Sequence, residues 1–518
     1  MGKNCQCGHY PTIIVPGIGQ SKVELLDNEG KRLKLAWPLD IDSKYLLKKI
    51  LPSALKMMVL RGDRGFTDVL YKELCRAFSP LAANTEGIPK ANLKVVTYPN
   101  SVASCSEEDR GFIYRMVPME QLSAVIGEDH LYFFAYHSFG QPYETAKDLD
   151  KFIQSVKQQT GHDKVNLVPV SLGGSISVAY FDAYGYKGDV NRVANFVPAI
   201  NGTSIVADVI DDKLYLDEPK ELFDFILDRK TAEKIISFMR LLPKDIDKKI
   251  TRTAISALKD TVLINSPAMW AVVPRERYEK LRSKYLCDSK RDVLKAKTDR
   301  FYRAQKEYEK LFLLQKERGV EFFTICGFGK KLMPFVKSKN TNSDTVIDLV
   351  SASLGAKAAP YGEKLPLDYK ANRQYCSDES HNHISPCRTV DASEGLFPDT
   401  TWYFSGQVHD DIAYHDVALT LCCEILSNKE FKNVYSNPLY PQFNGSRNIK
   451  EIKYKLMPKA KRLLETPLES SIKEKLLKAV AKCDELFANT IVKDNTLTKE
   501  AAKQLELAII SAQAIQTQ

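Results

Sequence analysis

A serine in a glycine-rich turn is the first residue of this sequence whose type and position could do chemistry. Ser171 lies in VNLVPVSLGGS, where an apolar run typical of a β-strand leads into the serine, and the helical phrase SISVAYFDAYG follows. A strand, a sharp turn and a helix in this order expose a serine hydroxyl where neighbouring backbone comes close. Pro169 lies two residues before the serine, where glycine is usual. Its ring is tied back and its φ is fixed, so a proline can be tolerated at this position. The alternative is an ordinary strand-to-helix turn with an N-capping serine.

Two polar residues further along the chain could complete the chemistry of this serine. A serine nucleophile needs a base that takes its proton and an acid that orients the base. Asp344 follows the apolar phrases VEFFTICG and KLMPFV, and His409 follows TWYF, so both are expected in loops after late strands. Asp348 and Asp391 are alternative acids. His415 is the alternative base, although its position at the start of a helical phrase favours a surface helix cap.

Two further histidines and a glycine loop leave alternatives open. His381 and His383 lie in the polar loop SDESHNHISP, where they could line a pocket or have no role. Near the N-terminus, a short buried strand at 10–15 runs into Pro16-Gly17-Ile18-Gly19. A strand that ends in a tight glycine loop leaves backbone N–H groups free, as stabilisation of an oxyanion requires. A plain glycine turn is the alternative.

Strands and helices alternate around the serine. Residues 130–136, 165–170 and 190–197 read as strands, and the amphipathic phrase 144–160 reads as a helix that ends at Gly161. This alternation predicts a parallel sheet with helices on both faces. The sheet is expected to resume at 320–327 and 401–404, and residues 22–35 read as a β-hairpin across 27–30.

Two segments break the alternation. Residues 203–318 are helical and strongly charged, including the helical phrase at 217–243, and such an insertion at the strand ends of an α/β sheet is where a cap over an active site lies. A loop rich in Asn, Pro, Tyr and Gly after about residue 428 separates two helical phrases at the C-terminus. We therefore expect a core at 10–202 and 319–428, a helical cap at 203–318, and a helical bundle or tail at 450–518.

Composition narrows the class of protein. The 518 residues are 44% apolar and carry 74 basic and 65 acidic side chains, a net charge of +9 that is too evenly mixed for nucleic-acid binding. No run approaches the roughly 20 apolar residues of a membrane-spanning helix, and no signal peptide is apparent, so a cytoplasmic protein is expected. The phrase SKYLLKKILPSALKMMVL is basic and apolar together, which suits transient contact with a membrane surface, although a helix buried on one face is commoner.

Cysteine usage predicts neither a disulfide framework nor a metal site. Eleven scattered cysteines in a chain of this length are typical of reduced thiols. Cys5, Cys7 and His9 have ligand-like spacing, but no second pair completes a site, so a frayed terminus is the interpretation. Serine chemistry itself needs no metal and no cofactor, and we expect none.

Several phrases, in order, resemble the lecithin:cholesterol acyltransferase-like branch of the α/β-hydrolases, a group of lipid acyl hydrolases and acyltransferases. These phrases are VPGIGQSKVEL, HLYFFAYHSFG, VNLVPVSLGG, NSPAMWAVVP, NSDTVIDLVSASLG and FSGQVH, and they fall within residues 10–425. The resemblance implies an α/β-hydrolase fold, with Ser171 as nucleophile, Asp344 as acid and His409 as base. It also implies that the N–H of Leu172 and one from Ile18 or Gly19 stabilise the oxyanion.

Three positions depart from the pattern of that family. Pro169 replaces a small residue before the serine, and Thr345 replaces the glycine that follows the acid. The family's Tyr-Asp-Trp-Arg phrase is here Tyr136-His137-Ser138-Phe139, with no arginine. The first two leave the serine chemistry intact, whereas the third puts in doubt a contact between that loop and the substrate.

The expected function is a serine-dependent acyl hydrolase or acyltransferase that acts on small-molecule or lipid esters through an acyl-enzyme. The apolar phrase SPAMWAVV could line an acyl site or form ordinary cap core. The alternative is a catalytically silent protein of the same fold, which binds a partner or a membrane through its cap and tail.

Overall fold

The computed structural model describes residues 8–39, 43–60, 62–216, 237, 244–410, 412, 415–437, 440–444, 456–488 and 504–513. The helical phrase expected at 217–243, except Ser237, and the cysteines Cys5 and Cys7 lie outside the described residues.

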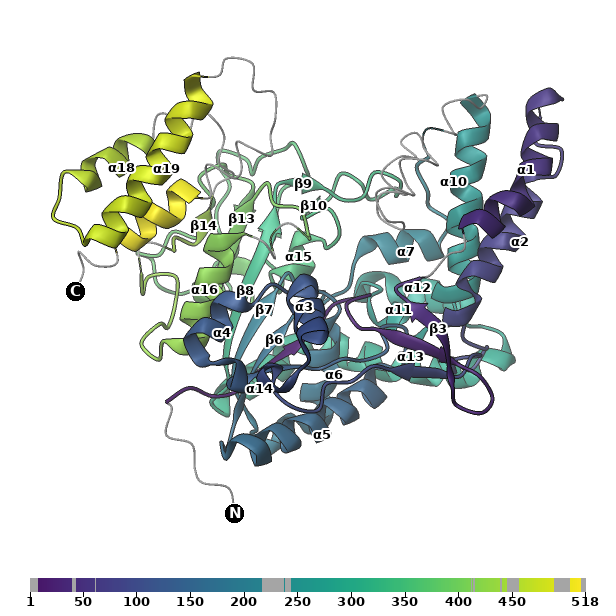
Figure 1. The fold of residues 1–518 in the computed structure, drawn as a ribbon, viewed down its shortest axis with the longest axis horizontal. Helices are drawn as coiled ribbons and strands as arrows, with labels where there is room; N and C mark the ends of the chain where they lie inside the picture. Colours follow the sequence, from purple (N-terminus) through teal and green to yellow (C-terminus); the bar gives the residue numbers. More distant parts are fainter. Residues whose placement is uncertain are drawn as a thin grey trace.

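Seven parallel strands form the central sheet (Figure 1). They lie in the order β14-β13-β8-β7-β6-β1-β5, and each neighbouring pair is parallel. Their bounds are Thr12–Val15 for β1, Leu131–Phe133 for β5, Val165–Pro169 for β6, Val190–Phe196 for β7, Glu321–Phe328 for β8, Thr401–Ser405 for β13 and Phe443–Asn444 for β14. The predicted α/β class with a parallel sheet is confirmed.

Side chains of the sheet alternate between two hydrophobic clusters, one on each face. In β1, Ile13 and Val15 belong to the first cluster and Ile14 to the second. Because both faces are buried, the strands are almost continuously apolar. Helices α5 (Pro142–Thr160), α6 (Gly173–Tyr184), α13 (Asp292–Lys306) and α14 (Tyr308–Glu317) contribute to the first cluster, and α3 (Glu107–Met116), α4 (Glu120–Ile126) and α16 (Asp416–Ser427) to the second.

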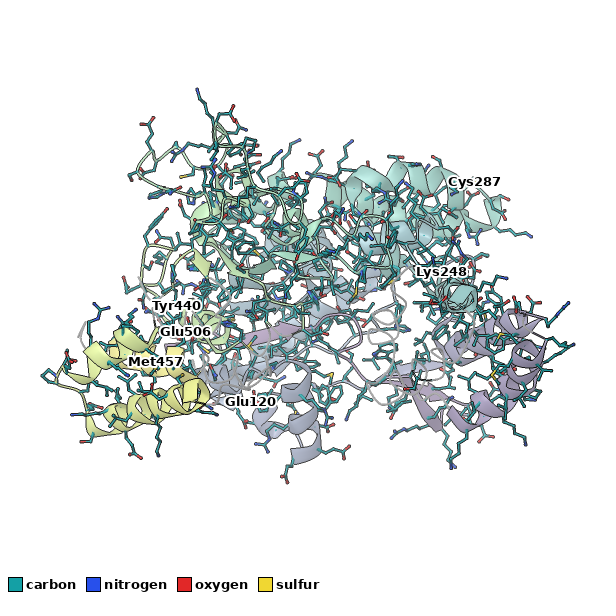
Figure 2. The ribbon with its side chains drawn as sticks, turned by 90° about the horizontal axis from the view of Figure 1, so that it is seen from above. Glu120, Lys248, Cys287, Tyr440, Met457 and Glu506 are labelled. Carbon is teal, nitrogen blue, oxygen red and sulfur yellow. The ribbon has the colours of Figure 1, made fainter. Side chains whose placement is uncertain are left out.

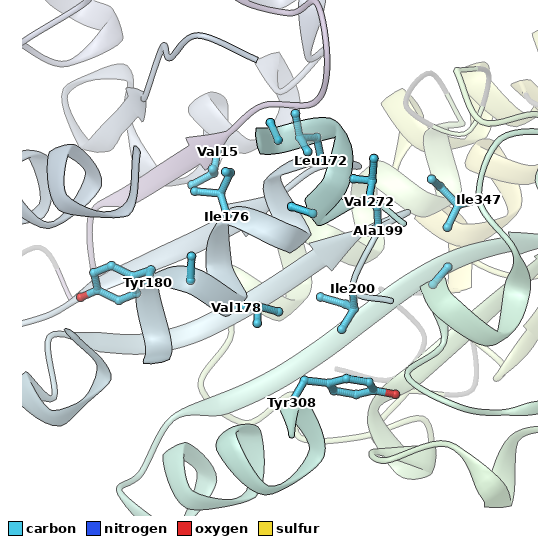
Figure 3. Close-up of a cluster of buried hydrophobic side chains, with 14 of the residues drawn as sticks. Val15, Leu172, Ile176, Val178, Tyr180, Ala199, Ile200, Val272, Tyr308 and Ile347 are labelled. Atoms are coloured by element: carbon cyan, nitrogen blue, oxygen red, sulfur yellow. The ribbon is translucent and has the colours of Figure 1, made fainter. Parts of the chain in front are cut away.

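Helix α6, which follows the serine, is buried in the first cluster. Figure 3 shows Ile176, Val178 and Tyr180 of this helix among side chains from several other elements. The predicted helix before β6 is also present as α5, and its C-cap Gly161 has a left-handed φ of 73°. A helix so enclosed on all sides holds the turn at its N-terminus rigidly against the sheet.

Smaller sheets flank the central one. Strands β2 (Val23–Leu26), β3 (Arg32–Trp37) and β4 (Leu93–Val95) form an antiparallel sheet, which confirms the predicted hairpin. Between β8 and β13 the chain forms short elements: β9 (Lys330–Lys331), β10 (Asn342–Ser343), α15 (Leu349–Ala352), β11 (Lys357–Ala358) and β12 (Val390–Asp391).

A helical layer lies beside the carboxyl ends of the strands. Helices α1 (Ser43–Val59), α2 (Phe66–Phe78) and α10 (Lys244–Leu258) pack around one apolar cluster and project together in Figure 1. The cluster comprises Ala54, Met57, Phe66, Leu70, Ile246, Ile250 and Ala254. Helices α7 (Ser204–Ile210), α11 (Pro267–Ala271) and α12 (Arg275–Tyr285) also belong to the 203–318 segment, whose last two helices, α13 and α14, pack on the sheet. Residues 43–78, distant in sequence, therefore share a layer with this segment.

The C-terminal helices pack around a cluster of their own. Helix α18 (Met457–Leu464), helix α19 (Ser470–Ala488) and the helical residues 504–513 share Leu476, Cys483 and Ile509, among other buried side chains. Figure 2 shows Met457 and Glu506 at the opposite end of the molecule from Lys248 of α10. Within the described ranges, every helix is too short or too polar to cross a lipid bilayer.

Candidate active site

The carboxyl edge of the central sheet brings Ser171, Asp344 and His409 together. Ser171 follows β6, Asp344 follows β10 in the excursion after β8, and His409 follows β13. Because β8 and β13 are parallel neighbours, the loops that follow them leave the sheet at the same edge as the loop after β6.

The turn at Ser171 has the strained backbone that exposes a side chain. Ser171 has a φ of 51°, in the left-handed region that non-glycine residues rarely adopt. Its carbonyl accepts the N–H groups of Gly174 and Ala199 at 2.9 and 2.8 Å, which hold the turn. A Cβ at Gly173 would lie 2.2 Å from the carbonyl oxygen of Val15, so only glycine lets the helix begin this close to β1.

Pro169 is accommodated by a gap in the ladder between β6 and β7. The two strands pair at Val165 and Leu167, and again at an isolated bridge between Val170 and Phe196. Pro169, which has no N–H to donate, lies between these paired positions of β6. On the other side of β6, Pro169 is paired in register with Val15 of β1. The proline therefore leaves the turn at Ser171 in the geometry described above.

A chain of hydrogen bonds joins the three side chains. Nε2 of His409 lies 3.0 Å from Oγ of Ser171, and Nδ1 lies 2.7 Å from Oδ2 of Asp344. The other carboxylate oxygen of Asp344 accepts the N–H groups of Val346 and Ile347 at 3.0 and 2.7 Å. Asp344 is 1% exposed, so its orientation is fixed. In this arrangement the histidine can take a proton from the serine while the aspartate holds the ring.

The pKa of His409 is raised above its ordinary value. Burial alone would lower this pKa, because it penalises the charged imidazolium, but the negative charge and hydrogen bond of Asp344 outweigh burial. An imidazolium formed beside Ser171 is thereby stabilised, which is what proton transfer from a serine hydroxyl requires.

The alternative acids and base are engaged elsewhere. Asp348 accepts the N–H and hydroxyl of Ser204 at 2.7 and 2.6 Å, and Asp391 accepts the hydroxyls of Ser393 and Tyr369 at 2.7 and 2.9 Å. His415 caps α16, where its Nδ1 accepts the N–H of Ala418 at 3.4 Å. His381 and His383 lie together in the loop that precedes β12.

The glycine loop after β1 lies against the serine. A Cβ at Gly17 would lie 2.9 Å from Cβ of Ser171, so the loop can approach only because this residue is glycine. The N–H of Gly19 donates to Oγ of Ser138 at 3.1 Å and is therefore already engaged. Among the described residues, the N–H groups of Ile18 and Leu172 meet no acceptor, and both residues line the same cavity as Ser171. These two amides can therefore receive an oxyanion.

The loop that departs from the family phrase supports the glycine loop. The hydroxyl of Tyr136 donates to the carbonyl of Pro16 at 2.6 Å, and Ser138 accepts from Gly19 as described. Burial lowers the pKa of His137 to about 4, so the ring is neutral and its Nδ1 accepts the N–H of Phe139 at 3.1 Å. Sequence reasoning did not find this supporting role, because it depends on contacts between residues that are distant in the chain.

Thr345 occupies a backbone conformation that favours glycine. Its φ is 87°, and its hydroxyl is buried with no hydrogen-bond partner in the described part of the chain. A β-branched residue is strained in this region, whereas glycine would adopt it without strain. Thr345 also lines the cavity beside His409.

Comparisons with known proteins find a likeness to solved structures but none at the level of sequence. No family model matches the sequence, and no curated protein matches it. A chain from the crystal structure of the Tle4–Tli4 complex matches with a TM-score of 0.37 and 13% identity, over 82% of this chain and 99% of that chain. The parallel sheet and its flanking helices settle the architecture. The fold is an α/β-hydrolase fold.

An apolar cavity of about 770 Å³ opens onto Ser171. This volume is in the range of sites that enclose a small molecule. Phe78 of α2 and Leu258 of α10 lie on its wall together with Phe335. The helices at 43–78 and those of the 203–318 segment therefore both contribute to the cavity wall. Apolar side chains predominate along the wall, among them Trp37, Leu39, Leu81, Met116, Phe139, Val197, Ile205, Val209, Ile255, Leu263, Met269, Val272 and Met333.

The apolar phrase SPAMWAVV is divided between the cavity wall and a buried cluster. Met269 and Val272 line the cavity, whereas Trp270 packs against Tyr278 in a separate buried cluster and donates to the carbonyl of Ile264 at 2.9 Å. One face of this segment therefore faces the serine and the other stabilises the layer above the sheet.

Proposed function

We propose that this protein is a serine-dependent acyl hydrolase or acyltransferase of the lecithin:cholesterol acyltransferase-like branch, acting on esters with apolar acyl chains. The observation that carries the proposal is the 3.0 Å contact between Oγ of Ser171 and Nε2 of His409 on the wall of a large apolar cavity. An apolar wall around a few polar groups favours an acyl chain over a polar substrate.

The reaction proceeds through an acyl-enzyme. Oγ of Ser171 attacks the ester carbonyl while Nε2 of His409 takes the hydroxyl proton, and Asp344 stabilises the imidazolium. The N–H groups of Leu172 and Ile18 bind the negative oxygen of the tetrahedral intermediate. The C–O bond of the ester then breaks, and the leaving alkoxide takes the proton from His409.

The second half of the reaction restores the enzyme. Water or an acceptor alcohol gives its proton to His409 and attacks the acyl carbon, and Ser171 leaves with that proton. Hydrolysis and acyl transfer use the same residues and differ only in the acceptor. The division into a core at 10–202 and 319–428, a cap at 203–318 and a tail at 450–518 belongs to this proposal, with two changes. Strand β14 pairs with β13 and joins the core, and α13 and α14 pack on the sheet, so the cap that covers the acyl chain is the earlier part of 203–318.

Helix α1 supports a substrate that is held in a lipid surface. Leu47, Leu51, Leu55 and Val59 recur every fourth residue and are between 41% and 79% exposed, whereas a neighbouring face of the helix, at Ala54 and Met57, is buried. The described part of α1 has no acidic residue. Four exposed lysines accompany the apolar stripe: Lys44, Lys48, Lys49 and Lys56. An apolar stripe flanked by cations matches the surface of an anionic bilayer.

The helix is also placed where such contact is useful. Helix α1 shares its buried cluster with α2 and α10, and these two helices contribute Phe78 and Leu258 to the cavity wall. A bilayer bound at α1 therefore lies beside the elements that cover the acyl site.

Steady-state hydrolysis of p-nitrophenyl esters of increasing chain length tests the proposal. We expect a preference for medium or long chains over acetate, and Met269→Trp should shift the preference towards shorter chains by filling the cavity. His409→Ala should abolish hydrolysis, whereas the matched change His415→Ala should retain most of it. A folded wild-type protein that hydrolyses none of these esters, and transfers no acyl group to an alcohol, would favour the catalytically silent alternative.

A further inference from the structure

Four side chains with metal-binding atoms converge away from Ser171. Cys376, His381 and His383 lie in the loop between β11 and β12, and Asp399 lies directly before β13. One ligand atom from each of the four lies within 4.8 Å of every other. Cys376 and His383 are buried, and His381 and Asp399 are partly buried, so the cluster is shielded from solvent on one side.

The separations between these atoms match the edges of a tetrahedron. Sγ of Cys376 lies 3.5 Å from Nδ1 of His381, which lies 3.1 Å from Oδ1 of Asp399. The same carboxylate oxygen lies 3.3 Å from Nε2 of His383. With zinc bonds of about 2.0 Å to nitrogen or oxygen and about 2.3 Å to sulfur, tetrahedral ligands are about 3.3 Å apart, or about 3.5 Å for sulfur and nitrogen.

The second nitrogen of each histidine has an oxygen partner that orients the ring. Nδ1 of His383 lies 2.8 Å from Oε1 of Gln442, whose amide nitrogen donates to the carbonyls of Pro398 and Thr401 at 2.6 and 3.2 Å. That amide is thus fixed with its oxygen towards the ring, so Nδ1 is the protonated nitrogen. Oδ2 of Asp378 lies 3.4 Å from Nε2 of His381 in the same way. Metal-bound histidines characteristically have such partners.

The inward-facing atoms lack the hydrogen bonds that burial demands. Nε2 of His383 and Oδ1 of Asp399 are buried and make no hydrogen bond with any described residue. Because Nδ1 of His383 contacts Gln442, Nε2 is the ring nitrogen that faces the Asp399 carboxylate, 3.3 Å from Oδ1. His383 is only 3% exposed, and a metal ion held between these two atoms would give each of them a partner.

We propose that Cys376, His381, His383 and Asp399 form a tetrahedral Zn²⁺ site that stabilises the structure. Thiolate and imidazole ligands favour zinc over Mg²⁺ or Ca²⁺, which prefer oxygen. Binding breaks the S–H bond of Cys376, whose proton passes to solvent, and forms four bonds to the metal. Four protein ligands leave no position for water or substrate, so the site is structural.

The position of the site indicates what it stabilises. Asp399 precedes β13 and His409 follows it, so the cluster lies at the opposite end of this strand from the serine. The ion joins the loop at 359–389 to the start of β13 and, through Gln442, to β14. The edge of the sheet that carries His409 is therefore secured at its other end.

Metal analysis of the full-length protein tests the proposal. The protein is treated with a chelator, reloaded with Zn²⁺, freed of excess metal and measured by mass spectrometry of the elements. We expect about one zinc ion per chain in the wild type. The zinc content should fall at least tenfold in Cys376→Ser and in His383→Ala. Cys387→Ser removes an exposed thiol from the same loop and is the matched control, which should keep its zinc. Chelation should lower the melting temperature of the wild type and leave the Cys376→Ser variant unchanged.

Cobalt titration of the wild-type protein keeps the test valid if a variant fails to fold. Co²⁺ in this site should give the strong visible absorption of tetrahedral coordination, together with a thiolate charge-transfer band. The proposal is overturned if the wild-type protein binds neither Zn²⁺ nor Co²⁺ at stoichiometric concentration. Zinc that remains bound in a folded Cys376→Ser, His383→Ala double variant would overturn it as well. Because these readouts do not depend on ester hydrolysis, they stand apart from the proposed activity.

Discussion

Nδ1 of His409 lies 2.7 Å from Oδ2 of Asp344, and the backbone N–H of His409 donates to the carbonyl of Asp344 at the same distance. The two loops are therefore joined twice, once through side chains and once through backbone. The backbone bond positions the histidine, and the carboxylate selects the tautomer whose Nε2 faces Ser171.

The pH dependence of hydrolysis should report this contact. His409 must be neutral to act as a base, and Asp344 raises its pKa, so the activity should rise with pH through an inflection above about 6.5. In Asp344→Asn the charge is lost, and the inflection should move to lower pH while kcat falls by about 10⁴. The pH profile of kcat/KM gives the inflection, and kcat at saturating substrate gives the loss of rate. An inflection that is unchanged in Asp344→Asn would show that another group titrates.

Ser138 should act as a positioning residue for the oxyanion loop. Its hydroxyl accepts the N–H of Gly19 at 3.1 Å, next to the free amide of Ile18. Ser138→Ala should lower kcat by about tenfold, less than the 10²–10³ lost with a direct donor, and leave KM nearly unchanged. Ser138→Thr should restore part of the rate. Ser283→Ala, a change of the same type on the exposed face of α12, is the control and should have no effect.

Replacement of the strained Thr345 should stabilise the protein. A left-handed conformation costs an L-residue about 1–2 kcal/mol. Glycine avoids this cost, but its greater conformational freedom in the unfolded chain lowers the stability by about 0.5–1 kcal/mol. Thr345→Gly should therefore raise the free energy of unfolding by up to about 1 kcal/mol. Thr341→Gly, at a threonine outside the left-handed region, should lower it. Thermal melts of the two variants decide the matter, and a lower melting temperature for Thr345→Gly would contradict the strain.

The exposed face of α1 should bind anionic membranes. We expect the protein to sediment with vesicles of phosphatidylglycerol more than with vesicles of phosphatidylcholine, because each lysine contributes about 1 kcal/mol near an anionic surface. Leu51→Asp should weaken binding by about tenfold, and Lys48→Glu should reduce the preference for anionic lipid. Leu33→Asp alters a leucine of β3 that is more exposed than Leu51 and should bind as the wild type does. If Leu51→Asp and Leu33→Asp weaken vesicle binding equally, α1 is not the surface that docks on the membrane.

The architecture could be predicted because its signals are local. Strand-type and helical phrases alternate along the chain, and the phrases expected at 10–15, 165–170 and 401–404 are strands of one parallel sheet. The chain order of serine, acid and histidine could also be read, since each follows a strand. The contact among Ser171, Asp344 and His409 depends on strand order in the sheet, which sequence spacing does not fix.

The rest depends on contacts between distant residues. The pairing of α1 and α2 with α10 joins helices that are far apart in the chain, so the wall at Phe78 could not be foreseen. The strain at Thr345 needs a φ angle, although its position after the acid was a signal. The convergence of His381 and His383 with Asp399 crosses a loop and a strand boundary, and no standard metal-binding spacing marks it.

The central claim is that Ser171 is an activated nucleophile, and covalent labelling tests it most directly. A fluorophosphonate probe should attach through phosphorus to Oγ of Ser171 with loss of fluoride, giving one adduct per chain in the peptide that contains VPVSLGG. Ser171→Ala should not be labelled, and His409→Ala should be labelled far more slowly. An intact, folded wild-type protein that takes up no probe, or labelling that persists in Ser171→Ala, would contradict the account.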